Sequence, residues 1–117
     1  MRVLLVDDEE ELVTTLAERL SLRGVDARWA TSAKDASRLA EAESFDLAVL
    51  DVKMPQMGGI DLKKQLEQMH PGMKFIFLTG HGSEQDFRTG SAEAACYLVK
   101  PVNIEVLLQT MKKALEP

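Results

Sequence analysis

The segment VLLVDDEE, residues 3–10, places a short apolar run directly before a run of acids. Further apolar runs follow along the chain at Ala27–Ala30, Leu47–Leu50, Phe75–Leu78 and Tyr97–Val99. Short, nearly continuous apolar runs are typical of parallel strands that are covered on both faces. The run Ala27–Ala30 is more mixed, which indicates a strand at the edge of the sheet. The sequence therefore predicts a sheet of five parallel strands.

Helical patterns separate these runs. The apolar spacing and the capping residues predict helices over about Glu10–Arg23, Ser32–Ala42 and Ile60–His70, a weaker one that starts near Ser83, and a last one from Asn103 to about Leu115. Strict alternation of strands and helices indicates right-handed crossovers with helices on both faces of the sheet. The predicted fold class is therefore α/β and doubly wound.

Size and composition restrict the class of protein. A chain of 117 residues with 45% hydrophobic and 28% charged residues is expected to form one globular domain over residues 1–117. The net charge of −5 argues against nucleic acid or an anionic membrane as a direct partner. The single Cys96 cannot form an internal disulfide, and no apolar stretch reaches membrane-spanning length. These features predict a cytoplasmic location.

Residues suited to a ligand site follow four of the five predicted strands, whereas Thr31 and Ser32 after the second carry no obvious chemistry. Asp7 and Asp8 follow the first, Asp51 the third, Thr79 the fourth and Lys100 the fifth. In sheets of this kind the ligand site lies beyond the carboxyl ends of the strands. The first, third, fourth and fifth strands can be neighbours, so we expect these side chains to converge on one patch.

The chemistry of that patch suits a divalent cation and a phosphoryl group. Crowded carboxylates repel one another, and Mg²⁺ relieves the repulsion through one or two carboxylate ligands. An aspartate such as Asp51 can accept a phosphoryl group, while Lys100 and Thr79 offer a positive charge and a hydroxyl donor. Taken singly, each residue has a simpler explanation: the acids after Val6 would favour a helix N-terminus, for example. The simpler explanations do not predict that all of these residues fall at strand ends that can be adjacent.

Four motifs extend this interpretation to a family. The segments VDDE (6–9), LDVKMP (50–55), LTGHG (78–82) and YLVKP (97–101) resemble those of the receiver domain of two-component response regulators. The resemblance covers essentially the whole chain. It implies a flavodoxin-like, doubly wound five-stranded parallel sheet with strand order 2-1-3-4-5 and five helices.

The resemblance also implies roles for individual residues. Asp51 would be the phosphoacceptor, and Lys100 would contact the phosphoryl group. Asp8 would be a direct ligand of Mg²⁺ or Mn²⁺, Asp7 would act mainly through water, and the backbone carbonyl of Lys53 would complete the protein ligands.

A switch and a set of partners follow from the same resemblance. Thr79 and Tyr97 would form the switch pair, and the peptide bond from Lys100 to Pro101 would be cis. The phosphoryl donor would be the phosphohistidine of a sensor histidine kinase. The fourth helix, fifth strand and fifth helix, where Val106 lies, would control an output domain or target protein and could also form a homodimer.

Two other functions remain open at this point. Aspartate-nucleophile phosphatases and mutases share an Asp at a strand end, a metal and a Lys, but they usually carry a second Asp two residues on, where this chain has Lys53. An interaction module without phosphorylation is the other alternative. Of the remaining residues, we expect His81 to face solvent, Cys96 to be a small core residue and Trp29 to be half-buried packing.

Overall fold

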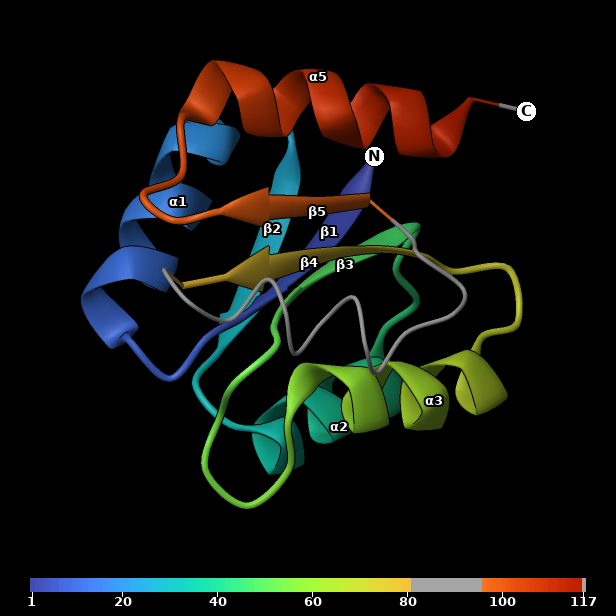
Figure 1. Ribbon diagram of the computed structural model, residues 1–117. Helices are drawn as coiled ribbons and strands as arrows, with labels where there is room; N and C mark the ends of the chain where they lie inside the picture. Colours follow the sequence, from blue (N-terminus) through green and yellow to red (C-terminus); the bar gives the residue numbers. More distant parts are fainter. Residues whose placement is uncertain (81–95, 117) are drawn as a thin grey trace.

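The computed structural model describes residues 1–80 and 96–116 (Figure 1). Its elements, in chain order, are β1 (Arg2–Val6), α1 (Glu10–Leu22), β2 (Asp26–Ala30), α2 (Ala33–Ala42), β3 (Leu47–Asp51), α3 (Gly59–Met69), β4 (Lys74–Thr79), β5 (Cys96–Val99) and α5 (Ile104–Leu115). The described residues thus contain all five expected strands and four of the five expected helices. The weak helix expected from Ser83 falls outside the described residues, as does His81.

The strands form one sheet in the order β2-β1-β3-β4-β5, and every neighbouring pair is parallel. This confirms the expected strand order, including β2 at an edge. Helices α1 and α5 cover one face of the sheet, and α2 and α3 cover the other (Figure 1). None of the helices within the described part of the chain is both long and apolar enough to cross a membrane.

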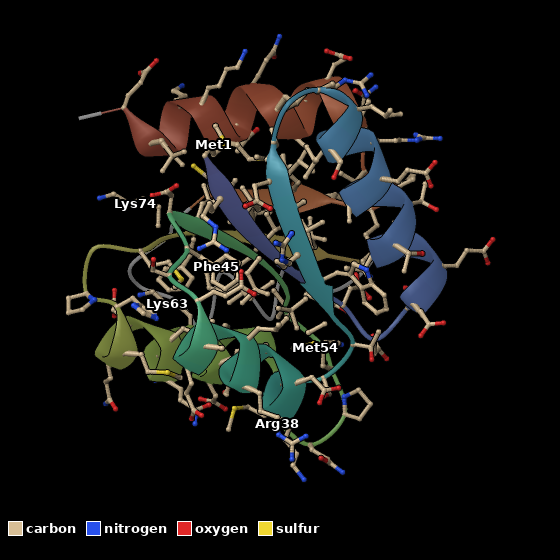
Figure 2. The ribbon with its side chains drawn as sticks, turned by 180° about the vertical axis from the view of Figure 1, so that it is seen from behind. Met1, Arg38, Phe45, Met54, Lys63 and Lys74 are labelled. Atoms are coloured by element: carbon tan, nitrogen blue, oxygen red, sulfur yellow. The ribbon has the colours of Figure 1, made fainter. Side chains whose placement is uncertain are left out.

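Each strand contributes to two hydrophobic cores, because successive side chains point to opposite faces. In β1, Leu4 and Val6 pack toward α2 and α3, whereas Val3 and Leu5 pack toward α1 and α5. Phe45 contributes to the core on the side of α2 and α3, and Figure 2 shows it between the sheet and these helices. Burial on both faces explains why β1, β3 and β4 read as continuous apolar runs.

Side chains cap two of the helices. Ser32 Oγ accepts a hydrogen bond from Asp35 N at 3.1 Å at the start of α2. Asn103 Oδ1 accepts from the N–H groups of Glu105 and Val106 at the start of α5. Such caps satisfy backbone donors that the first turn leaves without a partner, and they fix where each helix begins.

Exposure corrects the expectation for Cys96. This residue is exposed at the start of the edge strand β5, so the expectation that it is a core residue was wrong. Trp29 on β2 is 41% exposed and packs only in part. Val106 is 45% exposed on α5, as its position off the apolar stripe predicts.

Candidate functional site

The carboxyl ends of β1, β3, β4 and β5 bring the predicted site residues to one edge of the sheet. Asp7 directly follows β1, Asp51 ends β3, Thr79 ends β4 and Lys100 directly follows β5. Within the described residues, Asp7, Asp51 and Thr79 are the buried polar or charged side chains, with exposed fractions of 1%, 4% and 0%. Buried polar groups of this kind are costly unless partners compensate them.

Lys100 is the partner of the buried carboxylates. Its Nζ lies 2.8 Å from Asp7 Oδ2 as an ion pair without hydrogen-bond geometry, and it donates hydrogen bonds to Glu9 Oε1 at 3.0 Å and to Asp51 Oδ2 at 3.4 Å. The peptide bond from Lys100 to Pro101 is cis, as expected. The backbone N–H of Lys100 donates to the carbonyl oxygen of Thr79 at 2.8 Å, which anchors it to the end of β4.

One lysine does not neutralise the negative charge of the site. Burial, together with the nearby charge of Asp7, raises the pKa of Asp51 to about 6, although Lys100 opposes this rise. Burial also raises the pKa of Asp7. Burial lowers the pKa of Lys100, but its contacts with Asp7 and Glu9 outweigh that effect and raise the pKa above the usual lysine value. The raised pKa values of Asp7 and Asp51 indicate that the site holds more negative charge than Lys100 compensates.

Backbone N–H groups orient the two buried carboxylates. Asp7 Oδ1 accepts from Glu9 N at 2.9 Å, and Asp51 Oδ1 accepts from Lys53 N at 3.3 Å. Both bonds run from a residue two positions further along the chain, so each loop fixes the carboxylate that precedes it. The expected role of the Lys53 carbonyl as a metal ligand stays a prediction.

The three aspartates of the site fit a divalent cation. One carboxylate oxygen from each of Asp7, Asp8 and Asp51 can be chosen so that all three lie within 4.8 Å of one another. The side chain of Asp8 is exposed, whereas those of Asp7 and Asp51 are buried. A cation in this cluster would have oxygen ligands and an open side, which Mg²⁺ uses to keep water molecules.

Thr79 and Tyr97 lie on neighbouring strands beside this cluster. Thr79 Oγ1 is buried, and among the described residues it has no hydrogen-bond partner. An unsatisfied buried hydroxyl costs about 1–3 kcal/mol, so a new acceptor near it would be bound favourably. Tyr97 on β5 is partly buried and packs against the core of α2 and α3. Whether these two residues move together stays a prediction.

The sequence did not indicate the roles of Gly59 and Glu9. A Cβ on Gly59 would lie 2.3 Å from the carbonyl oxygen of Asp51, so α3 passes directly against the end of β3. Only the fold shows this contact, although a glycine at the start of a predicted helix was a possible signal. Glu9 belongs to the acidic run, and its contact with Lys100 depends on the meeting of β1 and β5.

Comparisons with known proteins give a consistent result. Residues 3–112 match the family model described as the response regulator receiver domain. The chain is 35% identical over 115 residues to the transcriptional regulatory protein GlrR of Escherichia coli (strain K12), covering 97% of this chain and 26% of that protein. It is 39% identical over 115 residues to the transcriptional regulatory protein CpxR of the same strain, covering 97% of this chain and 49% of that protein.

A solved structure shows the same similarity in three dimensions. The chemotaxis protein CheY4 of Vibrio cholerae superposes with a TM-score of 0.87 at 30% sequence identity, and the match covers 97% of this chain and 98% of that one. By contrast, the chain spans only about a quarter to a half of the length of the two curated relatives, with 26% and 49% covered.

Proposed function

Because the chain belongs to the family of response regulator receiver domains, which are signalling domains, we propose that Asp51 accepts a phosphoryl group from the phosphohistidine of a sensor histidine kinase. A carboxylate oxygen of Asp51 would bond to phosphorus while the bond from phosphorus to the donor nitrogen breaks. The carboxylate cluster of Asp7, Asp8 and Asp51, with the carbonyl of Lys53, would hold Mg²⁺. When bound, this ion supplies positive charge beside the phosphoryl oxygens.

The observation that carries this proposal is the contact of Lys100 with the buried Asp51. Lys100 Nζ lies 3.4 Å from Asp51 Oδ2, so an ammonium group is in place beside the carboxylate that would become phosphorylated. The phosphoryl group carries close to two negative charges where the carboxylate carried one, and an ammonium group and a hydroxyl donor stabilise them. Lys100 and Thr79 are the groups that would supply them.

Acetyl phosphate tests the proposal on the protein as it exists. With Mg²⁺ present, we expect one phosphoryl group per chain, and peptide mapping by mass spectrometry should locate it at Asp51. Little labelling is expected when the metal is removed with a chelator. Labelling at another residue, or none at all under these conditions, would contradict the proposed chemistry.

A second prediction concerns stability. Mg²⁺ is expected to raise the melting temperature, because a cation that binds only the folded site stabilises it by RT ln(1 + [L]/Kd), or about 2.7 kcal/mol at a hundredfold excess over Kd. Asp8→Ala should remove most of this response while the protein stays folded, since the side chain of Asp8 is exposed. Thermal melts with and without Mg²⁺ measure both effects. An undiminished response in the variant would place the metal elsewhere.

The family also suggests partners for this chain. The relatives GlrR and CpxR are transcriptional regulators of which this chain matches only a part. We therefore propose that the domain controls an output domain or a target protein. The surface involved would be the expected fourth helix, which lies outside the described residues, together with β5 and α5, and a second copy of the chain could bind there as well.

Thr79 would couple phosphorylation to that surface. Its hydroxyl would move to the phosphoryl group, and Tyr97 would fill the vacated space. Shifting a population from about 1:99 to 99:1 requires roughly 5.5 kcal/mol, whereas one hydrogen bond to a charged group supplies about 1.5–3 kcal/mol. Either Lys100 and the metal also contribute to the shift, or the unphosphorylated protein already samples the active state.

Thr79→Ala is therefore expected to bind beryllofluoride, a mimic of the phosphoryl group, but to shift only in part toward the active state. Amide NMR spectra of the variant and the wild type, each with beryllofluoride and Mg²⁺, measure the extent of the shift at Tyr97 and Val106. Full wild-type shifts in Thr79→Ala would show that the proposed coupling is wrong.

A further inference from the structure

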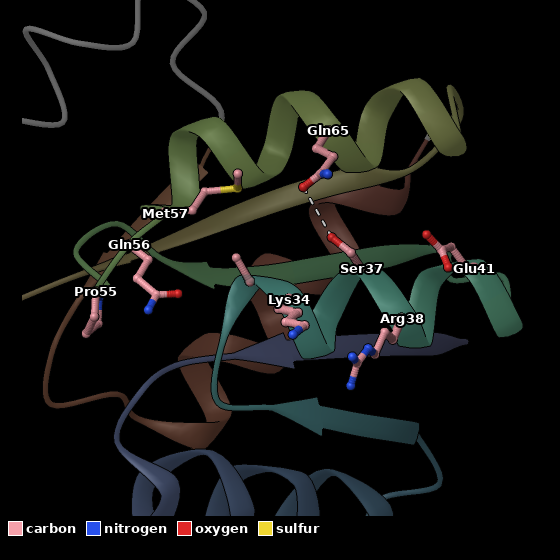
Figure 3. Close-up of a pocket in the computed structure, with 9 residues that line it drawn as sticks. Lys34, Ser37, Arg38, Glu41, Pro55, Gln56, Met57 and Gln65 are labelled. Carbon is pink, nitrogen blue, oxygen red and sulfur yellow. Dashed lines mark hydrogen bonds between the residues drawn. The ribbon is translucent and has the colours of Figure 1, made fainter.

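A cavity lies beside the loop that follows Asp51. It has a volume of about 520 Å³ and lies between α2, α3 and the loop that joins β3 to α3. The lining residues that matter here are Lys34, Ser37, Arg38, Gln56, Met57 and Gln65, and we call this cavity the α2–α3 cleft. Figure 3 shows the α2 side chains on one side of the cleft, with Met57 and Gln65 on the other. Cavities of about 300–1,000 Å³ are typical of small-ligand sites.

The walls of the cleft present mainly hydrogen-bond donors. Ser37 Oγ donates to Gln65 Oε1 at 3.2 Å (Figure 3), which occupies the acceptor of Gln65 and leaves its NH₂ group to donate. Among the described residues, the side chain of Lys34 makes no hydrogen bond or ion pair, and the only such contact of the Arg38 side chain is the 3.9 Å ion pair with Asp35. The ammonium and guanidinium groups lie one helical turn apart on the same face of α2.

Apolar surface lies next to these donors. Ala33, Pro55 and Met57 also line the cleft, so a ligand could place an apolar body against them while its acceptors reach α2. Among the described lining residues, the one carboxylate is that of Glu41, which lies one turn beyond Arg38, away from the loop (Figure 3). The charge of the cleft is therefore positive at the end where the apolar residues are.

We propose that the α2–α3 cleft is a binding site for a small organic anion with an apolar body, such as an aromatic carboxylate. Lys34 and Arg38 pair with the anionic group, the NH₂ group of Gln65 donates to it, and Met57 and Pro55 contact the apolar body. A carboxylate suits this set because guanidinium and ammonium donors form their stronger hydrogen bonds with charged acceptors. A neutral ligand of the same shape gains no ion pair from either cation.

The cleft is connected to Asp51 through the loop that lines it. The loop that lines it also donates the Lys53 N–H to Asp51 Oδ1, and Gln56 within it has a positive φ of 70°, which is unusual for a residue other than glycine. A ligand against Met57 would thus contact the segment that orients Asp51. Binding itself is measured without metal or phosphoryl donor, so its outcome is independent of the function proposed for Asp51.

The probe for the test is 2-naphthoate, titrated into the metal-free protein and followed by amide NMR. We expect the largest shifts at residues 33–41 and at Gln56 and Met57. The double variant Lys34→Ala, Arg38→Ala should bind roughly tenfold more weakly, because an exposed ion pair contributes up to about fivefold in affinity for each cation. The neutral 2-naphthylmethanol should also bind more weakly than 2-naphthoate.

The double variant Lys112→Ala, Lys113→Ala is the matched control. It removes the same charge from exposed positions on α5, which covers the opposite face of the sheet (Figure 1), and its affinity should equal that of the wild type. The proposal is overturned by equal affinity for the naphthoate in the Lys34, Arg38 variant, by equal affinity of the wild type for the neutral analogue, or by largest shifts that map to Lys100 while residues 33–41 do not shift. Thermal melts of both double variants show that each remains folded.

Discussion

Asp51→Asn is expected to abolish phosphoryl incorporation and, in the absence of metal, to stabilise the fold. The amide is a far weaker nucleophile than the carboxylate, so mass spectrometry after acetyl phosphate treatment should show no label at this position. The same substitution removes a buried charge whose pKa is raised to about 6 by burial and by Asp7. Loss of function and gain of stability thus come from one carboxylate, as is common at active sites.

The sign of the stability effect follows from linkage. Because the pKa of Asp51 is higher in the folded chain, the folded state binds the proton more tightly than the unfolded state does. The ionised side chain therefore lowers the free energy of unfolding above about pH 6, and this penalty fades as the pH falls toward 4. A rise of about two pKa units corresponds to about 1–3 kcal/mol, given 1.36 kcal/mol per unit and some screening by solvent.

Urea denaturation in chelator at pH 8 and at pH 4 measures this difference. Asp51→Asn should be more stable than the wild type at pH 8, and the two should converge near pH 4. The control is Glu18→Gln, which removes an exposed carboxylate from α1 and should not raise the stability at pH 8 in this way. If Asp51→Asn is no more stable than the wild type at pH 8, Lys100 compensates the carboxylate fully and the ionised Asp51 does not destabilise the fold.

Gly59→Ala is expected to cause the largest loss of stability among single-methyl changes at this site. The new Cβ would lie 2.3 Å from the carbonyl oxygen and 2.9 Å from the carbonyl carbon of Asp51, and 3.3 Å from Leu50 Cβ. Two of these are backbone atoms of a central strand, which cannot move without shifting β3 itself. Overpacking of this kind costs about 3 kcal/mol, which exceeds the gain in helix propensity of about 1 kcal/mol from Gly to Ala.

Gly72→Ala is the matched control, because a Cβ at Gly72 would meet no atom within 4 Å. We expect that variant to unfold at nearly the wild-type urea concentration, while Gly59→Ala unfolds at a clearly lower one. Gly59→Ala should also label more slowly with acetyl phosphate, since relief of the contact displaces Asp51. Wild-type stability in Gly59→Ala would mean that α3 can move away from β3 without cost.

Local sequence determined the elements and their order. The apolar runs that predicted strands at Val3–Val6 and Leu47–Leu50 lie within β1 and β3, whose observed bounds differ by one residue each. The reason is physical: a strand covered on both faces must be apolar at nearly every position, and this requirement is visible without knowledge of the fold. The same alternation of strands and helices placed Asp51 and Lys100 at the carboxyl ends of strands, where parallel sheets bind their ligands.

Tertiary structure alone determined which side chains contact one another and how these contacts change their pKa values and exposure. The 3.0 Å hydrogen bond from Lys100 to Glu9 joins residues 91 positions apart. The pKa of Asp51 depends on burial and on Asp7, which lies far from it in the sequence. Cys96 is exposed because β5 is an edge, and the contact of Gly59 with β3 depends on how α3 packs. Such properties arise from distances between segments that are remote in the chain, whereas strands and caps arise from neighbours. The sequence by itself thus determined where the proposed acceptor, the proposed cation ligands and the lysine lie along the chain, and the packing of the sheet determined their charge and contacts.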